Sequence, residues 1–519
     1  MRVIDFFDQG AAFYPNNVAF HDLADGSDTT YAQASRVSHK VASALHQRGY
    51  VKGSKIGILA PNSNVAFEVL LGAFRAEAVW LPINPRNPVD INVDLLTRFD
   101  GDLLLYHSNY ETEARAIAAG TPNLKEIVCI NKTDIEGENL DSWLAAADDF
   151  HQVGDEQADD IAAIFPTGGT TGKSKGVIMS HQAIEAMFTN FYSHFDYYDN
   201  TCHLVVAPMT HSAGLIGALH FARGGKNVMM AAADPEGIMQ TIEQQKITHF
   251  FLPPTVMYMM LAHENVNNYD YSSLQHFLVG AAPTSLSKLK EAINVFGPVM
   301  TEAFGQSEAP AAICAKAPWD YMNSDGSIND ARLASVGRPC VMNKVVIMDD
   351  DCNVLAPGEA GEICVKGNLV NPGYYKNEAA TREAQIDGWL HTGDVGVMDK
   401  DGYITIVDRK KDMIITGGFN VFPNEIEQVI SAQAAVQDCA VVGIPDEKWG
   451  EAVKAVVQLK PDSDLIESEL VAIIKAELGS VKTPKSIDFV ESLPRSPVGK
   501  VLKAEIRKQF WGQSERAVN

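Results

Sequence analysis

The chain has 519 residues, of which 46% are hydrophobic and 21% are charged. This composition excludes disorder for most of the chain, and the length predicts either three units of ~150 residues or one large and one small domain. Forty-two lysines and arginines stand against 66 aspartates and glutamates, and the resulting net charge of −24 argues against a nucleic-acid-binding surface.

The amino-terminal segment carries Asp5 and Asp8 where a signal peptide has an apolar core. No uncharged apolar run reaches the ~18 residues of a membrane span. The seven cysteines are scattered, with no CxxC pair and no His/Cys cluster of zinc spacing. We therefore expect a protein of a reducing compartment, the cytoplasm, without a membrane span, a disulfide framework or a structural zinc site.

Short β-rich runs alternate with helical patterns from the amino terminus onward, which is typical of α/β layers. The run 56–59 (IGIL) predicts a strand, and the apolar periodicity before it predicts a helix that closes near Gly49. Another helix follows Ser180, with an apolar stripe over 184–195. We expect this stripe to pack in the core, although it could also line a ligand pocket.

The carboxyl-terminal third changes character. From about residue 335, the runs KVVIM, EICVKG and YITIVD predict short strands between Gly/Pro/Asp turns, and a compact α+β unit begins after Lys411. We therefore predict an α/β fold with a large N-terminal domain of layered mixed sheets and helices over 1–407. A hinge at 408–412 and a small mobile α+β lid over 413–519 complete the chain.

The segment 161–181 (IAAIFPTGGTTGKSKGVIMSH) carries the strongest chemical signal. After an apolar run come four glycines, whose backbone N–H groups can approach an anion, with three threonines and two lysines as further donors. This composition predicts a polyphosphate cradle, with a Gly-rich hairpin turn as the alternative. The segment departs from the P-loop of NTPases, which needs Gly at the position of Thr167. We expect the loop to join two strands rather than to begin a helix. The cradle residues are Thr167, Gly168, Gly169, Thr170, Thr171, Gly172 and Lys175.

This loop resembles the signature loop of the adenylate-forming superfamily, which includes acyl-CoA synthetases, luciferases and nonribosomal adenylation domains. Further segments resemble the other family motifs in the family's order, and the resemblance extends from about residue 10 to 505. They are VGAAP (279–283), TEAFGQSEAP (301–310), GWLHTGDVG (388–396), DRKKDMIITGGFNVFPNEIE (408–427) and PRSPVGKVLK (494–503).

The chain is most similar to fatty-acid or aryl-acid CoA ligases. This resemblance implies an ATP-dependent enzyme that forms an acyl-adenylate with release of pyrophosphate, and then an acyl-CoA thioester with release of AMP. ATP and CoA would be co-substrates, and Mg²⁺ the cofactor. Two alternatives remain: an adenylating enzyme that loads a separate carrier protein or feeds an oxygenase, and a noncatalytic nucleotide-binding member of the fold. The sequence shows no interface, so a dimer remains possible.

The resemblance assigns catalytic roles to Glu308, Lys500 and His211. Glu308 would hold Mg²⁺ with Thr167 as its partner, and Lys500 would stabilise the developing charge while the lid is closed. Taken alone, Glu308 or Lys500 would be an ordinary surface charge. His211 would flank the acid's carboxylate, and a core or capping histidine is its alternative.

The remaining nucleotide contacts follow from the same motifs. Phe304 would stack on adenine, and Ser307 would donate to the α-phosphate. Asp394 would accept from both ribose hydroxyls, unless it is only a turn residue, and Arg409 would add a ribose or phosphate contact. The adenine-side backbone would come from Ala281 and Ala282, and Gly305 would be a further nucleotide-binding residue.

In the lid, the resemblance makes Asp408 the hinge residue, with a structural salt bridge as its alternative. It also places a CoA tunnel at Gly417, Gly418, Phe419 and Asn420, where missing side chains would admit pantetheine.

Small residues characterise the predicted acyl pocket, which we expect to be open and apolar. They are Ala213, Gly214, Gly217 and Gly280, beside His211. No Asp or Lys is recognisable as a partner for an amino-acid head group, so we expect a plain carboxylic acid, fatty or aryl.

The chain departs from the commoner family pattern at four positions, none of which removes a charge. Gly168 replaces Ser, Ser174 replaces Pro, Phe304 replaces Tyr and Ser307 replaces Thr. We therefore expect activity, with a modest change in ATP affinity.

Overall fold

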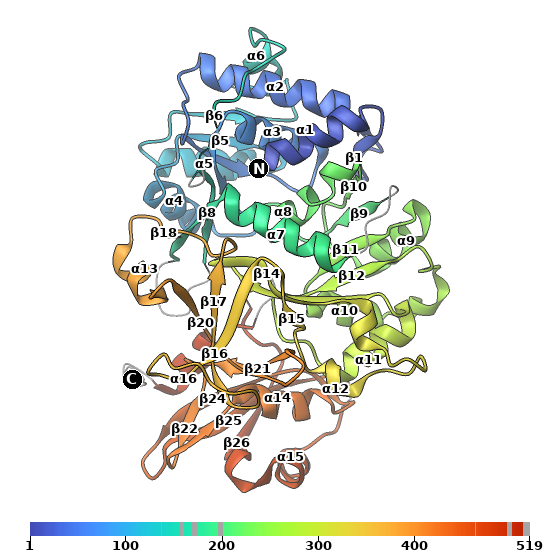
Figure 1. The fold of residues 1–519 in the computed structure, drawn as a ribbon, viewed down its shortest axis with the longest axis vertical. Coiled ribbons are helices and arrows are strands. Elements are labelled where there is room, and N and C mark those ends of the chain that lie inside the picture. The colour runs from blue at the N-terminus through green and yellow to red at the C-terminus, as the bar shows by residue number, and fades with distance from the viewer. Residues whose placement is uncertain are drawn as a thin grey trace.

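The computed structural model describes residues 1–135, 137–155, 157, 160–167, 174–195, 201–461, 463–495 and 501–511. A large domain of layered sheets and helices occupies the upper part of Figure 1, and a smaller carboxyl-terminal domain, which we call the lid, lies below it. Within these described ranges, no helix combines the length and the apolar character needed to traverse a bilayer.

A nine-stranded sheet forms one half of the large domain. Its order is β15 (Arg338–Pro339), β14 (Ala309–Lys316), β13 (Met300–Gln306), β12 (His276–Val279), β11 (His249–Leu252), β9 (Cys202–Val205), β10 (Lys226–Met229), β1 (Val18–Asp22) and β2 (Asp28–Thr30). Neighbours from β13 through β1 are parallel, and antiparallel strands close both sides. The loops after the parallel strands therefore emerge at one edge, where ligands bind in open α/β sheets.

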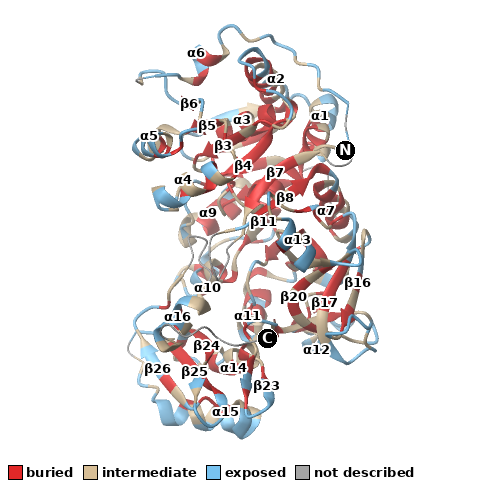
Figure 2. Ribbon diagram, turned by 90° about the vertical axis from the view of Figure 1, so that its left-hand side faces the viewer, coloured by how far each residue is buried: buried red, intermediate tan, exposed pale blue. Residues whose placement is uncertain are grey.

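A seven-stranded sheet forms the other half. Its order is β18 (Gly373–Tyr374), β8 (Gly176–Ser180), β7 (Ile161–Pro166), β4 (Val79–Pro82), β3 (Lys55–Leu59), β5 (Leu103–Tyr106) and β6 (Glu126–Cys129). The strand predicted at 56–59 is confirmed within β3. Apolar residues of both sheets meet in one hydrophobic core, which Figure 2 shows as the buried centre of the large domain.

Helices pack between the two sheets and on their outer faces. Those that contribute to the shared core are α1 (Val3–Phe13), α2 (Tyr31–Gln47), α3 (Asn64–Arg75), α7 (His181–His194) and α8 (Ser212–Ala218). The seven-stranded sheet is covered by α4 (Val89–Arg98) and α5 (Glu111–Gly120), and the nine-stranded sheet by α9 (Pro235–Gln245), α10 (Pro254–Leu261) and α11 (Leu286–Phe296). Short helices are α6 (Leu140–Leu144), α12 (Asp330–Leu333) and α13 (Glu378–Ala384).

The predicted helix after Ser180 is confirmed as α7. Its amino end is capped by the Ser180 hydroxyl, which accepts from Ala183 N–H over 3.1 Å. Its stripe is a core stripe, as expected. Buried members are Ile184, Met187, Phe188, Phe191 and Phe195.

A third sheet connects the large domain to the lid. It contains β16 (Asn343–Met348), β17 (Ala360–Gly367), β20 (Trp389–Met398) and β19 (Gln385–Ile386), with β21 (Ile404–Arg409) paired to β20. The predicted hinge 408–412 covers the last two residues of β21 and the turn that follows, shortly before the lid's first strand begins at Ile414; its role as a hinge stays a prediction.

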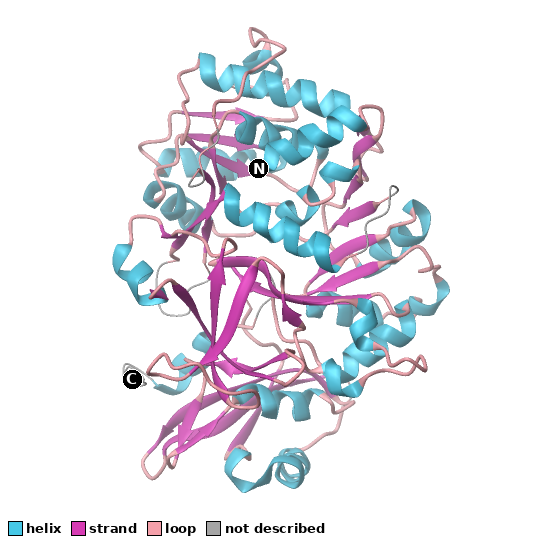
Figure 3. Cartoon of the chain, in the orientation of Figure 1, coloured by secondary structure: helices cyan, strands magenta, loops and turns pink. Residues whose placement is uncertain are grey.

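The lid has its own sheet and its own small core, whose buried members run from Ile414 to Ile487. The sheet consists of β23 (Phe419–Val421), β22 (Ile414–Thr416), β25 (Gly450–Leu459), β24 (Val436–Asp446) and β26 (Ser486–Val490). Around it lie α14 (Pro423–Ser431), α15 (Glu467–Lys482) and α16 (Lys503–Trp511), as Figure 3 shows. The α/β layers and the small α+β lid predicted from the sequence are therefore confirmed.

Candidate active site

The predicted phosphate loop lies between two neighbouring strands. β7 ends and β8 begins at the facing pair Pro166 and Gly176. Beyond this pair, Thr167 N–H donates to the Lys175 carbonyl over 2.8 Å, and Lys175 N–H donates to Thr167 Oγ1 over 3.3 Å. The loop thus joins two strands, as predicted. Its phosphate contacts stay a prediction, because the described residues do not include Gly168, Gly169, Thr170, Thr171 and Gly172.

A tyrosine links this loop to Glu308. The Tyr374 hydroxyl, on β18, donates to Glu308 Oε1 over 2.6 Å, and the Lys175 ammonium lies 4.9 Å from the centre of the Tyr374 ring. Burial and the neighbouring Glu308 raise the pKa of Tyr374, so the hydroxyl keeps its proton. Tyr374 therefore contacts both Glu308 and Lys175, and the Lys175 backbone is paired with Thr167. Sequence analysis missed Tyr374, whose signal was the Gly-Tyr-Tyr run after a Pro-Gly turn.

Asn371 fixes the backbone of Ser307 and Glu308. Its N–H donates to the Glu308 carbonyl over 2.8 Å, and its Nδ2 donates to the Ser307 carbonyl over 2.7 Å. Its Oδ1 accepts from Ser180 N–H over 3.2 Å, and the residue is only 1% exposed. One buried amide thus ties the end of β13 to the end of β8. No local sequence pattern marks this asparagine.

The two predicted ribose residues meet across adjacent strands. Asp394 on β20 faces Arg409 on β21 in the ladder, and Arg409 Nε lies 3.1 Å from Asp394 Oδ1. Asp394 is 4% exposed, whereas the Arg409 side chain is 39% exposed. A buried carboxylate is thereby held beside a guanidinium that reaches solvent; their ribose contacts stay a prediction.

The adenine-side residues follow the carboxyl end of β12. Ala281 is exposed and has a φ of +68°, and Ala282 is partly exposed. Phe304 is 9% exposed and packs in the large core, so most of its ring is already covered. Gly305 is required where it stands, since a Cβ there would lie 2.5 Å from Ala311 N. Adenine stacking on Phe304 stays a prediction.

His211 lies at the start of α8, after the loop that leaves β9. Its ring packs edge-on to Phe165 with 6.3 Å between ring centres, and its Nδ1 lies 3.2 Å from Ser212 Oγ. The side chain does not cap α8, although it precedes the helix. Burial lowers the pKa of His211, so the imidazole is neutral at pH 7.

The expectation that the neighbouring glycines leave open space is wrong at two positions. A Cβ on Gly214 would lie 2.3 Å from the Met209 carbonyl oxygen, and one on Gly217 would lie 3.1 Å from Asn227 Oδ1. These glycines allow α8 to pack closely against the preceding loop and β10. Ala213 is buried, and a Cβ on Gly280 would lie 3.2 Å from the Ala303 carbonyl oxygen. The acyl-pocket assignment itself stays a prediction.

An ionic cluster that the sequence did not reveal surrounds the predicted hinge residue. Asp408 accepts from the N–H groups of Arg409 and Asn424, both over 2.7 Å. Lys503 pairs with Glu427 at 2.7 Å, and Arg507 with Asp412 at 2.7 Å. Burial alone would lower the pKa of Lys503, but Glu427, Asp408 and Asp412 together raise it. The cluster joins the hinge segment to α14 and α16.

Lys500 lies outside the described residues, but its flanks are paired. Arg495 faces Val501 in an antiparallel bridge, and Leu502 N–H donates to the Pro494 carbonyl over 2.9 Å. Lys503, which begins α16 shortly afterwards, belongs to the hinge cluster. The contact of Lys500 with ATP stays a prediction.

The segment predicted as a CoA tunnel is the β22–β23 hairpin. Gly417 and Gly418 form its two-residue turn with φ values of +57° and +81°, a conformation that favours glycine. Gly417 N–H donates to the Trp449 carbonyl over 2.8 Å, while Phe419 and Asn420 are exposed. The tunnel stays a prediction.

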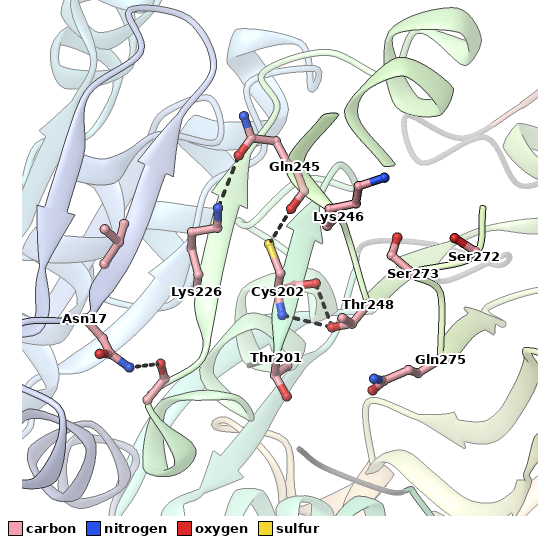
Figure 4. A pocket seen from close by; sticks show the side chains of 12 residues that line it. Asn17, Thr201, Cys202, Lys226, Gln245, Lys246, Thr248, Ser272, Ser273 and Gln275 are labelled. Carbon is pink, nitrogen blue, oxygen red and sulfur yellow. Dashed lines mark hydrogen bonds between the residues drawn. The ribbon is translucent and has the colours of Figure 1, made fainter. Parts of the chain in front are cut away.

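A pocket of about 660 Å³ opens at the amino ends of the parallel strands β9 to β12, whereas the adenine-side residues follow the carboxyl end of β12 (Figure 4). Some of its polar groups bond to one another: Lys226 donates to Gln245 Oε1 over 3.2 Å, and Cys202 N–H donates to Thr248 Oγ1 over 2.9 Å. None of the predicted site residues lines it.

Family models match both parts of the chain. The model described as AMP-binding enzyme matches residues 7–375, and the AMP-binding enzyme C-terminal domain matches residues 425–500. The chain belongs to the AMP-binding enzyme family. The resemblance inferred from the ordered motifs is thereby confirmed.

Named relatives of this AMP-binding enzyme include acid–CoA ligases and a fatty acid–[acyl-carrier-protein] ligase, ScoC of Streptomyces coeruleorubidus, which is 31% identical over 503 residues and covers 96% of this chain and 94% of that protein. This enzyme is 40% identical over 367 residues to the medium/long-chain-fatty-acid–CoA ligase FadD8 of Mycobacterium tuberculosis, a match that covers 69% of this chain and 63% of that protein. It is 32% identical over 487 residues to the feruloyl-CoA synthase of an Amycolatopsis species, covering 93% of this chain and 94% of the relative.

A solved structure of ATP-bound MatB from Rhodopseudomonas palustris matches the AMP-binding enzyme with a TM-score of 0.88 and 26% identity, covering 99% of each chain. The apo form of MatB matches with a TM-score of 0.77, covering 98% of this chain and 99% of MatB. The overall arrangement described here therefore resembles ATP-bound MatB more closely than apo MatB.

Proposed function

We propose that this AMP-binding enzyme is an ATP-dependent carboxylic acid–CoA ligase. It forms an acyl-adenylate with release of pyrophosphate, and then an acyl-CoA thioester with release of AMP. The observation that carries the proposal is the position of Glu308: Tyr374 holds its carboxylate, Asn371 holds its backbone, and the ring of Tyr374 lies against Lys175 at the base of the Gly-rich loop. A relative of nearly the same length, named a feruloyl-CoA synthase, supports the same reaction class.

The oxygen donors of this site fit Mg²⁺, which prefers carboxylates, hydroxyls and water and needs few protein ligands. Tyr374 occupies Oε1 of Glu308, so Oε2 would bind the ion, with the Thr167 hydroxyl as its partner. Bound there, Mg²⁺ would neutralise phosphate charge during adenylation.

In the first half-reaction, the acid's carboxylate attacks the α-phosphorus and the bond to pyrophosphate breaks. Both reactants are anions, so the site must supply cations, and Lys175 and Lys500 provide them. Asp394 accepts from the ribose hydroxyls while Arg409 balances its charge. The neutral His211 donates one N–H to the acid without adding a net charge.

In the second half-reaction, the CoA thiol attacks the acyl carbonyl and AMP leaves. We infer that the lid turns about Asp408, withdraws Lys500 and brings the hairpin of Gly417, Gly418, Phe419 and Asn420 to the site. The exposed Phe419 and Asn420 suit such a ligand-facing role. We place the reaction in the cytoplasm, since all seven cysteines are free of disulfides.

The test is release of pyrophosphate with a panel of straight-chain acids, benzoate, cinnamate and ferulate, with and without CoA. We expect acid-dependent pyrophosphate and a CoA thioester for at least one acid class. Pyrophosphate release with no thioester, followed by transfer to a phosphopantetheine carrier protein, would favour the carrier-loading alternative. No pyrophosphate with any acid would contradict an adenylating enzyme.

Lys500→Ala separates the two half-reactions. We expect adenylation to slow by about 10²-fold, the scale of one lost electrostatic stabiliser. Thioester formation from preformed acyl-adenylate should change little, because Lys500 then lies away from the site. Lys508→Ala, which removes an exposed lysine of α16, is the matched control. Equal loss in both half-reactions would contradict the role of Lys500.

A further inference from the structure

Outside the nucleotide site, a thiol, an imidazole and a carboxylate converge on the third sheet. They belong to Cys364 and Glu362 on β17 and to His391 on β20, and their ligand atoms all lie within 4.8 Å of one another. In the part of the chain that the structure describes, this is the group of His, Cys, Asp and Glu side chains close enough to share a metal ion. The sequence analysis excluded zinc spacing because the three residues form no local motif.

The register of the two strands creates this convergence. Cys364 faces His391 directly in the antiparallel ladder, and Glu362 lies two residues before Cys364 on the same strand. Because side chains alternate along a strand, Glu362 and Cys364 project from the same face. A register shift between them brings the Glu362 carboxylate over the imidazole.

The two distances from the imidazole suit a tetrahedral ion. His391 Nδ1 lies 3.5 Å from Cys364 Sγ and 3.2 Å from Glu362 Oε2. Zinc bonds of about 2.0–2.3 Å to N, O and S place neighbouring tetrahedral ligands ~3.3–3.6 Å apart. Gly393 N–H donates to the other carboxylate oxygen, Oε1, over 2.9 Å and so aims Oε2 at His391. Such an outer hydrogen bond is how metal-binding carboxylates are oriented.

The geometry points to a site at Glu362, Cys364 and His391 for a borderline-soft divalent cation of the zinc class, distinct from the Mg²⁺ site at Glu308. A thiolate and an imidazole select Zn²⁺ or Co²⁺ over Mg²⁺, which prefers oxygen ligands. Three protein ligands leave the fourth position to water, which is typical of an exchangeable ion.

Lys410 competes with the ion for Glu362. Its ammonium lies 3.4 Å from Glu362 Oε2 and 2.7 Å from Asp350 Oδ1. A cation at the site must displace Lys410 toward Asp350, which already pairs with it. Lys410 follows Arg409 in the predicted hinge segment. Metal binding would therefore move a side chain of the segment that connects the large domain to the lid.

The test is a titration of the chelator-treated, full-length protein with Co²⁺ in a non-thiol reductant. We expect one equivalent to bind with a thiolate-to-cobalt absorption band that Zn²⁺ abolishes. Cys364→Ser should remove the band, and Cys352→Ser, which removes the exposed cysteine, should keep it. An absent band in the parent protein, an unchanged band in Cys364→Ser, or a band lost only in Cys352→Ser would overturn the site.

Two further variants test the carboxylate and do not depend on the thiol variant folding. Glu362→Gln keeps an acceptor for Gly393 N–H but loses its charge, so Co²⁺ should bind at least tenfold more weakly. Lys410→Gln removes the competing cation, so Co²⁺ should bind several-fold more tightly. Unchanged affinity in Glu362→Gln, or weaker binding in Lys410→Gln, would overturn the three-ligand assignment.

Discussion

The large domain and the lid differ in their histidines. All fourteen histidines occur up to His391, and none occurs in the lid. In the large domain, the rings of four histidines form a column with neighbouring centres 4.5, 5.2 and 5.0 Å apart: His203, His220, His249 and His276. Both parts also hold buried ion pairs, such as Lys316 with Glu302 in the large domain and Lys503 with Glu427 in the lid.

A buried histidine and a buried charge are stabilised in different ways. Burial lowers the pKa of His203 to about 3, so this ring is neutral at pH 7. Its burial costs stability only at a pH low enough to protonate the histidine in the unfolded chain. A buried charge, by contrast, is tolerated only with its counter-charges in place. The large domain should therefore be sensitive to acid, and the lid to removal of a charge partner.

Acid gives the largest expected effect. Burial also lowers the pKa of His181 to about 4, and it lowers that of His220 well below 6.5. The unfolded chain binds more protons than the folded one below its histidine pKa of about 6.5, so stability falls as the pH drops from there toward 4. At pH 5, each of the three histidines His181, His203 and His220 should lower the free energy of unfolding by ~2 kcal/mol.

Hydrogen exchange at pH 7.5 and pH 5 measures this loss region by region. Peptides from β9 to β12 should lose protection at pH 5, while β24 and β25 of the lid keep theirs. His203→Phe should reduce the loss in the large domain. An equal loss of protection in the lid would contradict the assignment to histidines.

Lys503→Met gives the next largest effect and should act on the lid. It leaves Glu427, Asp408 and Asp412 without their shared cation, which should cost about 3 kcal/mol. Lys508→Met on the same helix removes an exposed partner of Glu505 and should cost less than ~0.5 kcal/mol. Calorimetry of both variants checks this contrast. A similar small shift for both would show that the Lys503 cluster contributes little.

Asn371→Ala tests the uncharged anchor of the large domain. It leaves the Ser307 carbonyl and the Ser180 N–H without their partner, at a cost of about 2 kcal/mol in the free energy of unfolding. Because Glu308 is then less well fixed, the KM for Mg·ATP should also rise. Urea unfolding and pyrophosphate release measure the two effects. Asn131→Ala, at an exposed asparagine, is the control, and an unchanged KM with lost stability would make Asn371 purely structural.

The smallest expected effect distinguishes two adjacent glycines of the lid. Gly418→Ala should cost about 1 kcal/mol, because its φ is +81° but a Cβ meets no atom within 4 Å. Gly417→Ala should cost about 1 kcal/mol more, since a Cβ there would lie 2.6 Å from Trp449 Cε3. Thermal unfolding followed by tryptophan fluorescence compares them. Equal costs would mean that the Trp449 ring moves aside freely.

The sequence alone was sufficient for the family, the order of the motifs, the α/β layers and the separate lid. These properties can be recognised from local residue patterns, such as the Gly/Thr/Lys run after β7 or the apolar stripe of α7. It also identified Asp394 and Arg409, which the structure brings together although fourteen residues separate them.

Only the tertiary structure decided which distant residues hold the site together. Tyr374 and Asn371 reach Glu308 and Ser307 from more than sixty positions away, and Lys503 reaches back to Glu427 and the hinge. The same holds for Gly214, whose lack of a side chain admits the Met209 carbonyl. The physical reason is that hydrogen bonds, ion pairs and close packing depend on separation in space, which strand register and helix packing set and which local residue patterns do not encode.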